Sequence, residues 1–262
     1  MADKKTAVIT GSNSGIGLGI ARALAAEGHN VAINSYSDND EDHALAAEIA
    51  KEHGNETVYI SADLSSADQS RMLIEKAVDR FGSVDILVNN AGIQYVAPIE
   101  EFPVEKWDAI IAINMSSAFN TCAVAVPIMK KNGWGRIVNV ASAHGLTASP
   151  YKAAYVAAKH GVVGLSKVIA LEFAEAKINA TCNALCPGYV LTPLVEGQIE
   201  DQMKAHGMDR EEVLDKVMLT RQPTREFASV EQMGATTVFL CSDAASQITG
   251  TAISVDGGWT AL

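Results

Sequence analysis

Strand and helix signals alternate along the whole chain, and this alternation limits the possible folds more than any other feature. Short apolar runs rich in β-branched residues predict strands at 6–10, 30–34, 57–61, 85–89, 136–141, 178–185 and 252–255. Segments with helical spacing predict helices near 16–27, 41–53, 66–81, 104–131, 152–176 and 230–242. Strands separated by helices imply right-handed crossovers. We therefore expect an α/β fold with a doubly wound parallel sheet covered on both faces.

Length and repeats favour one domain. The chain has 262 residues, a size at which α/β folds are commonly a single unit, and it contains no internal repeat or low-complexity tract. We expect one domain over residues 1–262, with a polar segment at about 194–220 between the sixth strand and the last helix.

The charge balance excludes two classes of partner. The formal net charge is −11, which argues against nucleic acid and against an anionic membrane as partner. An acidic substrate would consequently need a local positive site.

Targeting signals are not apparent, and we expect a cytoplasmic protein. Residues 1–5 lead directly into the first strand without a hydrophobic leader. The uncharged stretch 109–129 is long enough for a membrane span, but polar residues and a proline interrupt it, so a helix buried in protein is expected. The four cysteines include no C-x-x-C pair and have no histidine at metal spacing, so they are interpreted as buried thiols in a reducing cytoplasm, with no metal site. They are Cys122, Cys182, Cys186 and Cys241.

The first strand ends in a glycine-rich turn. Gly11, Gly15 and Gly17 follow it with the spacing G-x-x-x-G-x-G, and an alanine-rich helix closed by Gly28 comes next. A strand, a glycine turn and a helix together aim backbone N–H groups at a pyrophosphate. The alternative is a plain turn without a ligand.

Tyr155 and Lys159 form the most informative pair of side chains. Four residues apart on a predicted helix, they lie on one face, about 5–6 Å apart at Cβ. An adjacent ammonium stabilises phenolate, so Lys159 is expected to lower the pKa of Tyr155 toward the working range of a general acid/base. The alternative is an exposed helix pair without function.

Five motifs in this order resemble the short-chain dehydrogenase/reductase family. They are the glycine turn, Asn89-Asn90-Ala91-Gly92, Ser142, Tyr155 with Lys159, and Pro187-Gly188. The resemblance covers essentially the whole chain and implies a Rossmann fold, a homotetramer and a nicotinamide cofactor.

The resemblance also assigns roles to residues. Ser142 would orient the substrate oxygen, Lys159 would hold the nicotinamide ribose, and Asn114 would support a proton-relay water. An ordinary cap at Ser142 and a buried amide at Asn114 are the alternatives. The cofactor-binding residues implied are Gly11, Asn13, Ser14, Gly15, Ile16, Gly17, Tyr36, Asp63, Leu64, Asn90, Ala91, Gly92, Tyr155, Lys159, Pro187, Gly188, Val190 and Thr192.

Charge favours NAD over NADP. An NADP site normally places an Arg or Lys against the 2′-phosphate, but the glycine turn is uncharged between its glycines and residues 33–50 contain no Lys or Arg. Asp38 lies 21 residues beyond Gly17. Either Asp38 or Tyr36 is expected at the adenosine ribose. Asp63, placed at the adenine by the resemblance, is alternatively only a turn cap.

The substrate pocket resembles the subgroup of this family that acts on D-3-hydroxybutyrate. In that subgroup, residues matching Gln94, His144, Lys152 and Gln198 bind the substrate carboxylate, beside Ser142 and Tyr155. Lys152 precedes Tyr155 by three residues, so both can face one pocket. A solvated surface lysine and an incidental loop histidine are the alternatives.

The expected reaction is NAD-dependent interconversion of (R)-3-hydroxybutyrate and acetoacetate. Segment 194–220 resembles the family's substrate lid, with Gly197 and Gly207 as hinge candidates, and a static helix pair is the alternative. Residues 256–259 resemble the family's terminal motif, which would pack subunits and close the pocket. Ketoacyl reduction, sugar oxidation and non-catalytic NAD sensing are the competing functions.

Overall fold

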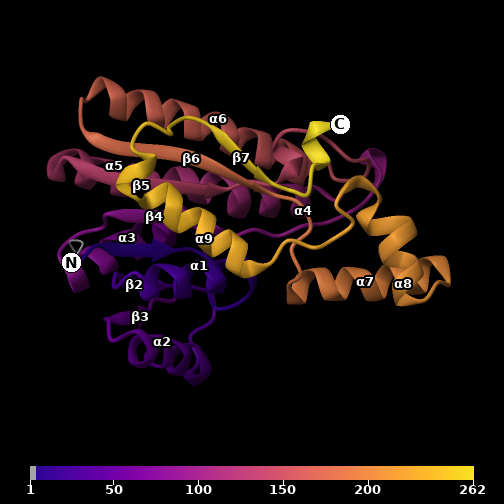
Figure 1. The fold of residues 1–262 in the computed structure, drawn as a ribbon, viewed down its shortest axis with the longest axis horizontal. Helices are drawn as coiled ribbons and strands as arrows, with labels where there is room; N and C mark the ends of the chain where they lie inside the picture. Colours follow the sequence, from indigo (N-terminus) through magenta and orange to yellow (C-terminus); the bar gives the residue numbers. More distant parts are fainter. Residues whose placement is uncertain (1–3) are drawn as a thin grey trace.

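The sheet has seven parallel strands in the order β3-β2-β1-β4-β5-β6-β7 (Figure 1). The computed structural model describes residues 4–262. Residues 1–3, part of the N-terminal segment in which no leader is expected, lie outside the described residues. The strands are β1 (Thr6–Ile9), β2 (Asn30–Ile33), β3 (Thr57–Tyr59), β4 (Ile86–Asn89), β5 (Trp134–Val140), β6 (Asn179–Pro187) and β7 (Ala252–Val255). All seven predicted strands are present, and the doubly wound sheet is confirmed.

Helices cover both faces of the sheet (Figure 1). They are α1 (Gly15–Ala26), α2 (Asp40–His53), α3 (Ala67–Phe81), α4 (Val104–Ile111), α5 (Ser117–Asn132), α6 (Ala153–Glu175), α7 (Pro193–His206), α8 (Arg210–Val213) and α9 (Val230–Cys241). Alternate residues of one strand enter different cores: Ala7 and Ile9 pack with α1 and α9, whereas Val8 packs with α3, α5 and α6. The strand order reverses between β1 and β4, and ligands of such sheets bind beyond the carboxyl ends there.

Glycines let α1 and α9 approach closely. A Cβ on Gly19 would lie 2.8 Å from Val230, and one on Gly234 would lie 2.8 Å from the Cβ of Ala23. The two helices therefore form one layer over β1, which fixes the position of the glycine turn at the start of α1.

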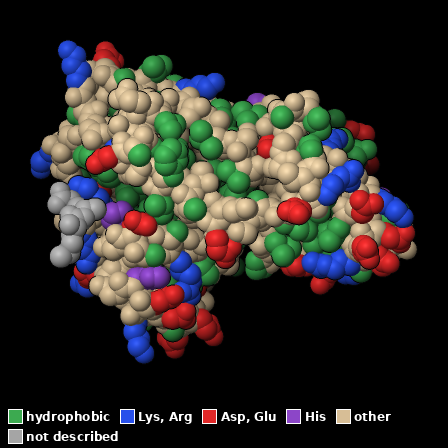
Figure 2. Space-filling view, in the orientation of Figure 1, with side chains coloured by type: hydrophobic (Ala, Val, Ile, Leu, Met, Phe, Trp, Pro, Cys, Tyr) green, Lys and Arg blue, Asp and Glu red, His purple; other side chains and the backbone are tan. Residues whose placement is uncertain are grey.

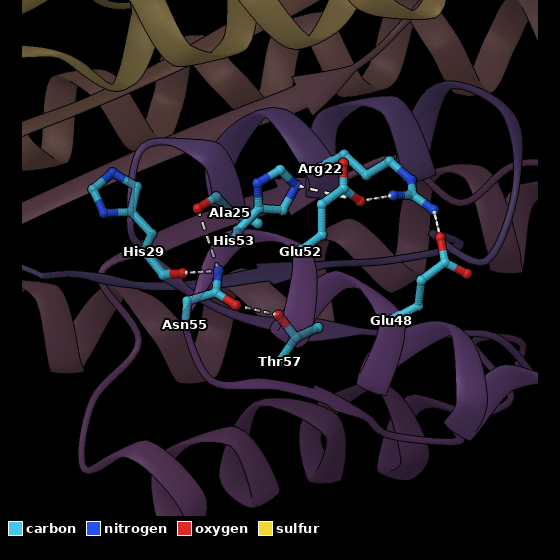
Figure 3. Close-up of polar contacts among 8 residues, drawn as sticks. All are labelled: Arg22, Ala25, His29, Glu48, Glu52, His53, Asn55 and Thr57. Carbon is cyan, nitrogen blue, oxygen red and sulfur yellow. Dashed lines mark hydrogen bonds and ion pairs between the residues drawn. The ribbon is translucent and has the colours of Figure 1, made fainter.

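The far end of α1 is tied to α2 and to the loop before β3 (Figure 3). Arg22 bridges Glu48 and Glu52 of α2, with Nη–Oε distances of 2.6 and 2.5 Å. Asn55 donates from Nδ2 to the carbonyl oxygens of Ala25 and His29, so it caps the end of α1. These contacts connect α1, α2 and the loop before β3 at the end of the sheet opposite the carboxyl ends of its strands.

The helix predicted over 104–131 is interrupted. Residues Ala112–Ser116 form a π-helical turn between α4 and α5. Asn114 lies in that turn, where its side chain pairs with the backbone of Ile93 in the loop after β4. This tertiary contact stabilises the wider π-helical turn. Because its partner lies in another loop, the local sequence pattern does not predict it.

The predicted lid segment consists of α7, α8 and short helical turns that project from the sheet (Figure 1). It has an apolar cluster of its own that includes Val195, Ile199, Val213 and Met218. Charged side chains of both signs cover its outer surface (Figure 2). Gly207 ends α7 in a left-handed conformation with φ of 62°, whereas Gly197 lies inside α7. A hinge role for either glycine stays a prediction.

Two helical stretches meet the length and hydropathy criteria for crossing a bilayer. They are Val104–Asn132 and Ala153–Glu175, and 44% of each apolar window is buried. Core helices of this length satisfy the same criteria. Several residues of α5 and α6 pack against the sheet in one apolar core.

Candidate active site

A cavity of about 690 Å³ opens at the carboxyl ends of the strands. Nearly all the predicted site residues line it. These are Gly11, Asn13, Ser14, Gly15, Ile16, Tyr36, Asp63, Leu64, Asn90, Ala91, Gly92, Gln94, Ser142, His144, Lys152, Tyr155, Lys159, Pro187, Gly188, Val190, Thr192 and Gln198. Gly17 and Asn114 do not line the cavity and contact lining residues from behind.

The glycine turn fits a phosphate group. Gly11 and Gly15 have φ of 57° and 54°, a region that side chains rarely adopt. A Cβ on Gly17 would lie 2.4 Å from the carbonyl oxygen of Gly11, so only glycine fits there. Ser14 does not cap α1 through its side chain, and the first turn has no acidic residue. The positive end of α1 is thus free to face an anion.

Asn90 holds this turn in place. Its Nδ2 donates to the carbonyl oxygens of Thr10 and Gly11, at 3.0 and 2.8 Å. Thr10 Oγ1 in return accepts from the backbone N–H groups of Asn90 and Ala91. The turn after β1 and the loop after β4 are therefore one rigid unit.

The structure separates the two ribose candidates. Tyr36 lines the cavity, with 81% of its surface exposed. Asp38 does not line it and contacts Nε2 of His43 at 2.9 Å. Asp42, which sequence reasoning missed, is buried and accepts from Asn13 and Ser37. A carboxylate thus lies directly behind the side chain of Asn13.

Tyr155 and Lys159 both line the cavity, but their interaction differs from the prediction. Burial raises the pKa of Tyr155, and the hydrogen bond from Ser142 only partly opposes that effect. The amine of Lys159 donates to the carbonyl oxygen of Val140 at 2.7 Å and lies 5.7 Å from the centroid of the Tyr155 ring. The expectation that Lys159 lowers the pKa of Tyr155 is therefore wrong for this structure. Burial also lowers the pKa of Lys159 itself, to about 8.

Asn114 is buried, and both groups of its side chain are paired. Oδ1 accepts from the N–H of Ile93 at 2.8 Å, and Nδ2 donates to the carbonyl oxygen of Ile93 at 2.9 Å. A Cβ on Gly92 would lie 3.6 Å from both Asn114 Oδ1 and Lys159 Nζ, so the two groups approach one point. The arrangement positions the loop after β4, and a role in proton relay stays a prediction.

The substrate end of the cavity carries Gln94, His144, Lys152 and Gln198. Burial, with smaller contributions from Lys152 and Arg221, lowers the pKa of His144 to about 4. His144 is therefore neutral near pH 7 and can offer an N–H but no charge. The cation that an acidic substrate needs is Lys152, whose pKa burial also lowers.

Aromatic side chains close this end. Trp259 lines the cavity, as its motif suggested, and its ring lies 5.2 Å from that of His144 and 5.4 Å from that of Tyr189. Sequence reasoning missed Tyr189, although it directly follows Pro187-Gly188. Other lining residues not predicted are Asn34, Ser35, Ala62, Ile93, Ile113, Val140, Ala141, Pro193 and Val195. Most of them are apolar or backbone contacts without a local signal.

A family model, two curated proteins and a solved structure are similar to this chain over nearly its whole length. A family model described as enoyl-(acyl carrier protein) reductase matches residues 11–260. The D-beta-hydroxybutyrate dehydrogenase of Rhizobium meliloti (strain 1021) is 54% identical over 98% of this chain and 99% of its own. The protein of the same name from Cupriavidus necator is 52% identical over 100% of both chains. A crystal structure of a putative short-chain alcohol dehydrogenase from Sinorhizobium meliloti 1021 has a TM-score of 0.88, 34% identity, and coverage of 98% and 96%.

Proposed function

This chain belongs to the short-chain dehydrogenase/reductase family of oxidoreductases, and from that premise we propose that it interconverts (R)-3-hydroxybutyrate and acetoacetate with NAD. The observation that carries the proposal is the substrate end of the cavity. There one cation, Lys152, lies with two amides and a neutral histidine beside Tyr155. This set suits one small carboxylate.

Tyr155 and Ser142 act on the substrate oxygen. In reduction, the protonated phenol of Tyr155 gives its proton to the keto oxygen, and Ser142 donates a hydrogen bond to the same oxygen. In oxidation, the phenolate takes the proton of the substrate hydroxyl. Because burial raises the pKa of Tyr155, the protonated form dominates at neutral pH. At neutral pH the phenol therefore carries the proton that reduction needs. The rate of oxidation, which needs the phenolate, should increase at alkaline pH.

The cavity suits a nicotinamide dinucleotide. The glycine turn and the start of α1 would hold the pyrophosphate, Tyr36 and Asp63 would contact the adenosine, and Lys159 would hold the nicotinamide ribose. Hydride transfer is the chemistry that a bound nicotinamide would supply. Because Lys159 and Tyr155 both lie on α6, the helix would fix the position of the ribose relative to the phenol.

Charge supports NAD rather than NADP. Lys152 and Lys159 are the cations among the described lining residues, and both come from the segment that carries Tyr155. Asn13, Ser14, Tyr36 and Asp63 line the cavity where the adenosine would lie, with Asp42 behind Asn13. A 2′-phosphate there would meet carboxylates and no cation.

We further propose that α7 and α8 close over the bound substrate. Val195 and Gln198 of α7 line the cavity, so movement of this segment would exclude water from the reacting atoms.

We also propose a cytoplasmic location. The four buried free thiols suit the reducing conditions of a cytoplasm.

A substrate panel tests the reaction. Purified protein is assayed with both enantiomers of short 3-hydroxy acids, a sugar and a thioester-linked 3-ketoacyl group, each with NAD(H) and NADP(H). We expect turnover of (R)-3-hydroxybutyrate with NAD and a higher kcat/KM than with NADP. Preference for the sugar or the thioester would move the assignment to a sister activity.

Lys152→Gln tests the carboxylate contact. The variant keeps a hydrogen-bond donor and removes the charge, so KM for 3-hydroxybutyrate should rise about 10- to 100-fold, as expected for loss of a charge-assisted hydrogen bond. Lys106→Gln, at an exposed lysine absent from the cavity lining, is the control. Equal KM values in Lys152→Gln and wild type would refute the contact.

A further inference from the structure

A chain of three side chains connects the end of the lid segment to the catalytic serine. Arg221 ends the short helical turn Leu219–Arg221 that follows α8. Its Nη1 donates to Oγ of Ser149 at 3.1 Å and to the carbonyl oxygen of Ala148 at 3.2 Å. Oγ of Ser149 lies 2.8 Å from Nε2 of His144. Nδ1 of His144 faces Oγ of Ser142 at 3.5 Å.

Proton counting along this chain limits the tautomer of His144. Arginine only donates, so Ser149 accepts from Arg221 and has one proton left to give. The oxygen has a second lone pair and could also accept from Nε2, but the Ser149 proton would then have no partner among the described residues. Donation from Ser149 to Nε2 satisfies both groups, so we take His144 as the acceptor. A neutral imidazole then carries its own proton on Nδ1.

The other end of the chain requires the same tautomer. Oγ of Ser142 already accepts from the backbone N–H of His144 at 3.1 Å. A hydrogen bond given by this hydroxyl to Tyr155 lowers the pKa of the phenol, so we assign its single proton to that side. It is not available for Nδ1, so the contact between Nδ1 and Ser142 is favourable only when Nδ1 carries the proton.

We propose that Ser149 and Arg221 are positioning residues that hold His144 as its Nδ1–H tautomer and thereby direct the Ser142 proton toward the substrate oxygen. The inference rests on the proposed function for its catalytic consequence. With the opposite tautomer, Nδ1 would accept the Ser142 proton and withdraw it from the reacting oxygen. Because Arg221 follows the lid segment directly, this arrangement depends on where that segment lies.

The test reads the tautomer directly. Full-length protein labelled with ¹⁵N in histidine is studied by two-bond ¹H–¹⁵N correlation spectra at pH 7, and the His144 signals are identified by their loss in His144→Gln. We expect a protonated Nδ1 and an unprotonated Nε2. A proton on Nε2, or a mixture of the two tautomers, would overturn the proposal even if the enzyme is fully active.

Variants connect the tautomer to the reaction. Ser149→Ala and Arg221→Gln should shift His144 toward the Nε2–H form and lower kcat and kcat/KM together by about tenfold, because the misdirected donor acts in the transition state. Ser149→Thr keeps the hydroxyl and should restore both readouts.

Arg225→Gln is the matched control, since that exposed arginine contacts Asp215 and lies outside the chain of contacts. An unchanged tautomer in Ser149→Ala would refute the role of Ser149. If wild type turns over no 3-hydroxy acid but shows the Nδ1–H form, the proposed function fails and the tautomer assignment stands.

Discussion

Lys159 is the residue at which function and stability oppose each other. Its amine is buried, with the carbonyl oxygen of Val140 as partner. A pKa lowered from 10.5 to about 8 corresponds to about 3 kcal/mol of destabilisation while the amine is protonated. The proposed contact between this amine and the nicotinamide ribose would give such a costly buried cation a function.

Lys159→Met should therefore stabilise the free protein. At pH 7 we expect a gain of about 1–2 kcal/mol, since the lost hydrogen bond to Val140 offsets part of the relieved burial cost. Between pH 8 and 10.5 the unfolded chain binds more protons at this lysine than the folded one, so wild-type stability rises with pH and the advantage of the variant shrinks.

Denaturant unfolding at pH 7 and 9.5, at fixed protein concentration, measures both values. Lys76→Met, at an exposed position of α3, should change neither. An advantage of equal size at both pH values would contradict the argument.

As the proposed acid/base, Tyr155 should make the two directions of the reaction depend oppositely on pH. With its pKa raised by burial, the oxidation rate should increase from neutral to alkaline pH, and the reduction rate should decrease. Tyr155→Phe should lower kcat by about 10²- to 10⁴-fold in both directions and leave affinity for NADH, measured by its fluorescence, unchanged. Retained turnover with the wild-type pH profile would exclude Tyr155 as the acid/base.

Residue positions were predictable here, but their ionisation was not. The motifs placed Ser142, Tyr155 and Lys159 around one cavity because each follows a strand or shares a helix face. The neutrality of His144 and the direction of the Lys159 amine depend on burial and on partners far away in sequence, such as Val140. Local pattern does not contain that information.

At the scale of elements, glycines mark the places where two segments must touch. The seven strands and the large helices followed from apolar periodicity. The π turn at Ala112–Ser116 did not, because the pairing of Asn114 with Ile93 selects it from outside the helix. The motif placed Gly17 in the turn expected to face a pyrophosphate, whereas its close approach to Gly11 and Asn90 is a finding of the structure.

Gly17→Ala should weaken cofactor binding with little change elsewhere. The new Cβ would lie 2.4 Å from the Gly11 oxygen and 2.5 Å from Asn90 Nδ2, so the turn must move. We expect Kd for NADH to rise at least about tenfold, roughly the effect of losing one good hydrogen bond to a charged group.

Gly164→Ala is the matched substitution on α6, where a new Cβ meets no atom within 4 Å. Gly164 shares the helix face of Val168 and Leu171, so only the Kd for NADH is compared, and it should be unchanged. Equal Kd values in Gly17→Ala and wild type would show that the turn does not hold the cofactor.

At the scale of the molecule, α5 and α6 present large apolar side chains to solvent. Leu171 and Val168 of α6 are 72% and 54% exposed, and Phe119 of α5 is 55% exposed. Residues 168 and 171 are three apart and share one helix face. The apolar windows of both helices are less than half buried within one chain. We propose that a second copy of the chain covers this surface, as the homotetramer implied by the family resemblance would require.

Replacing both α6 side chains by charge tests that assembly. Val168→Glu with Leu171→Glu should reduce the mass measured by light scattering below that of wild type, because two carboxylates would have to be buried without partners in the subunit contact. The single chain should keep its fold, measured by circular dichroism, since both side chains are exposed in it. Leu171→Met preserves apolar area and should preserve the mass. A wild-type protein with the mass of one chain, or a double variant with the wild-type mass, would place the subunit contact elsewhere or exclude it.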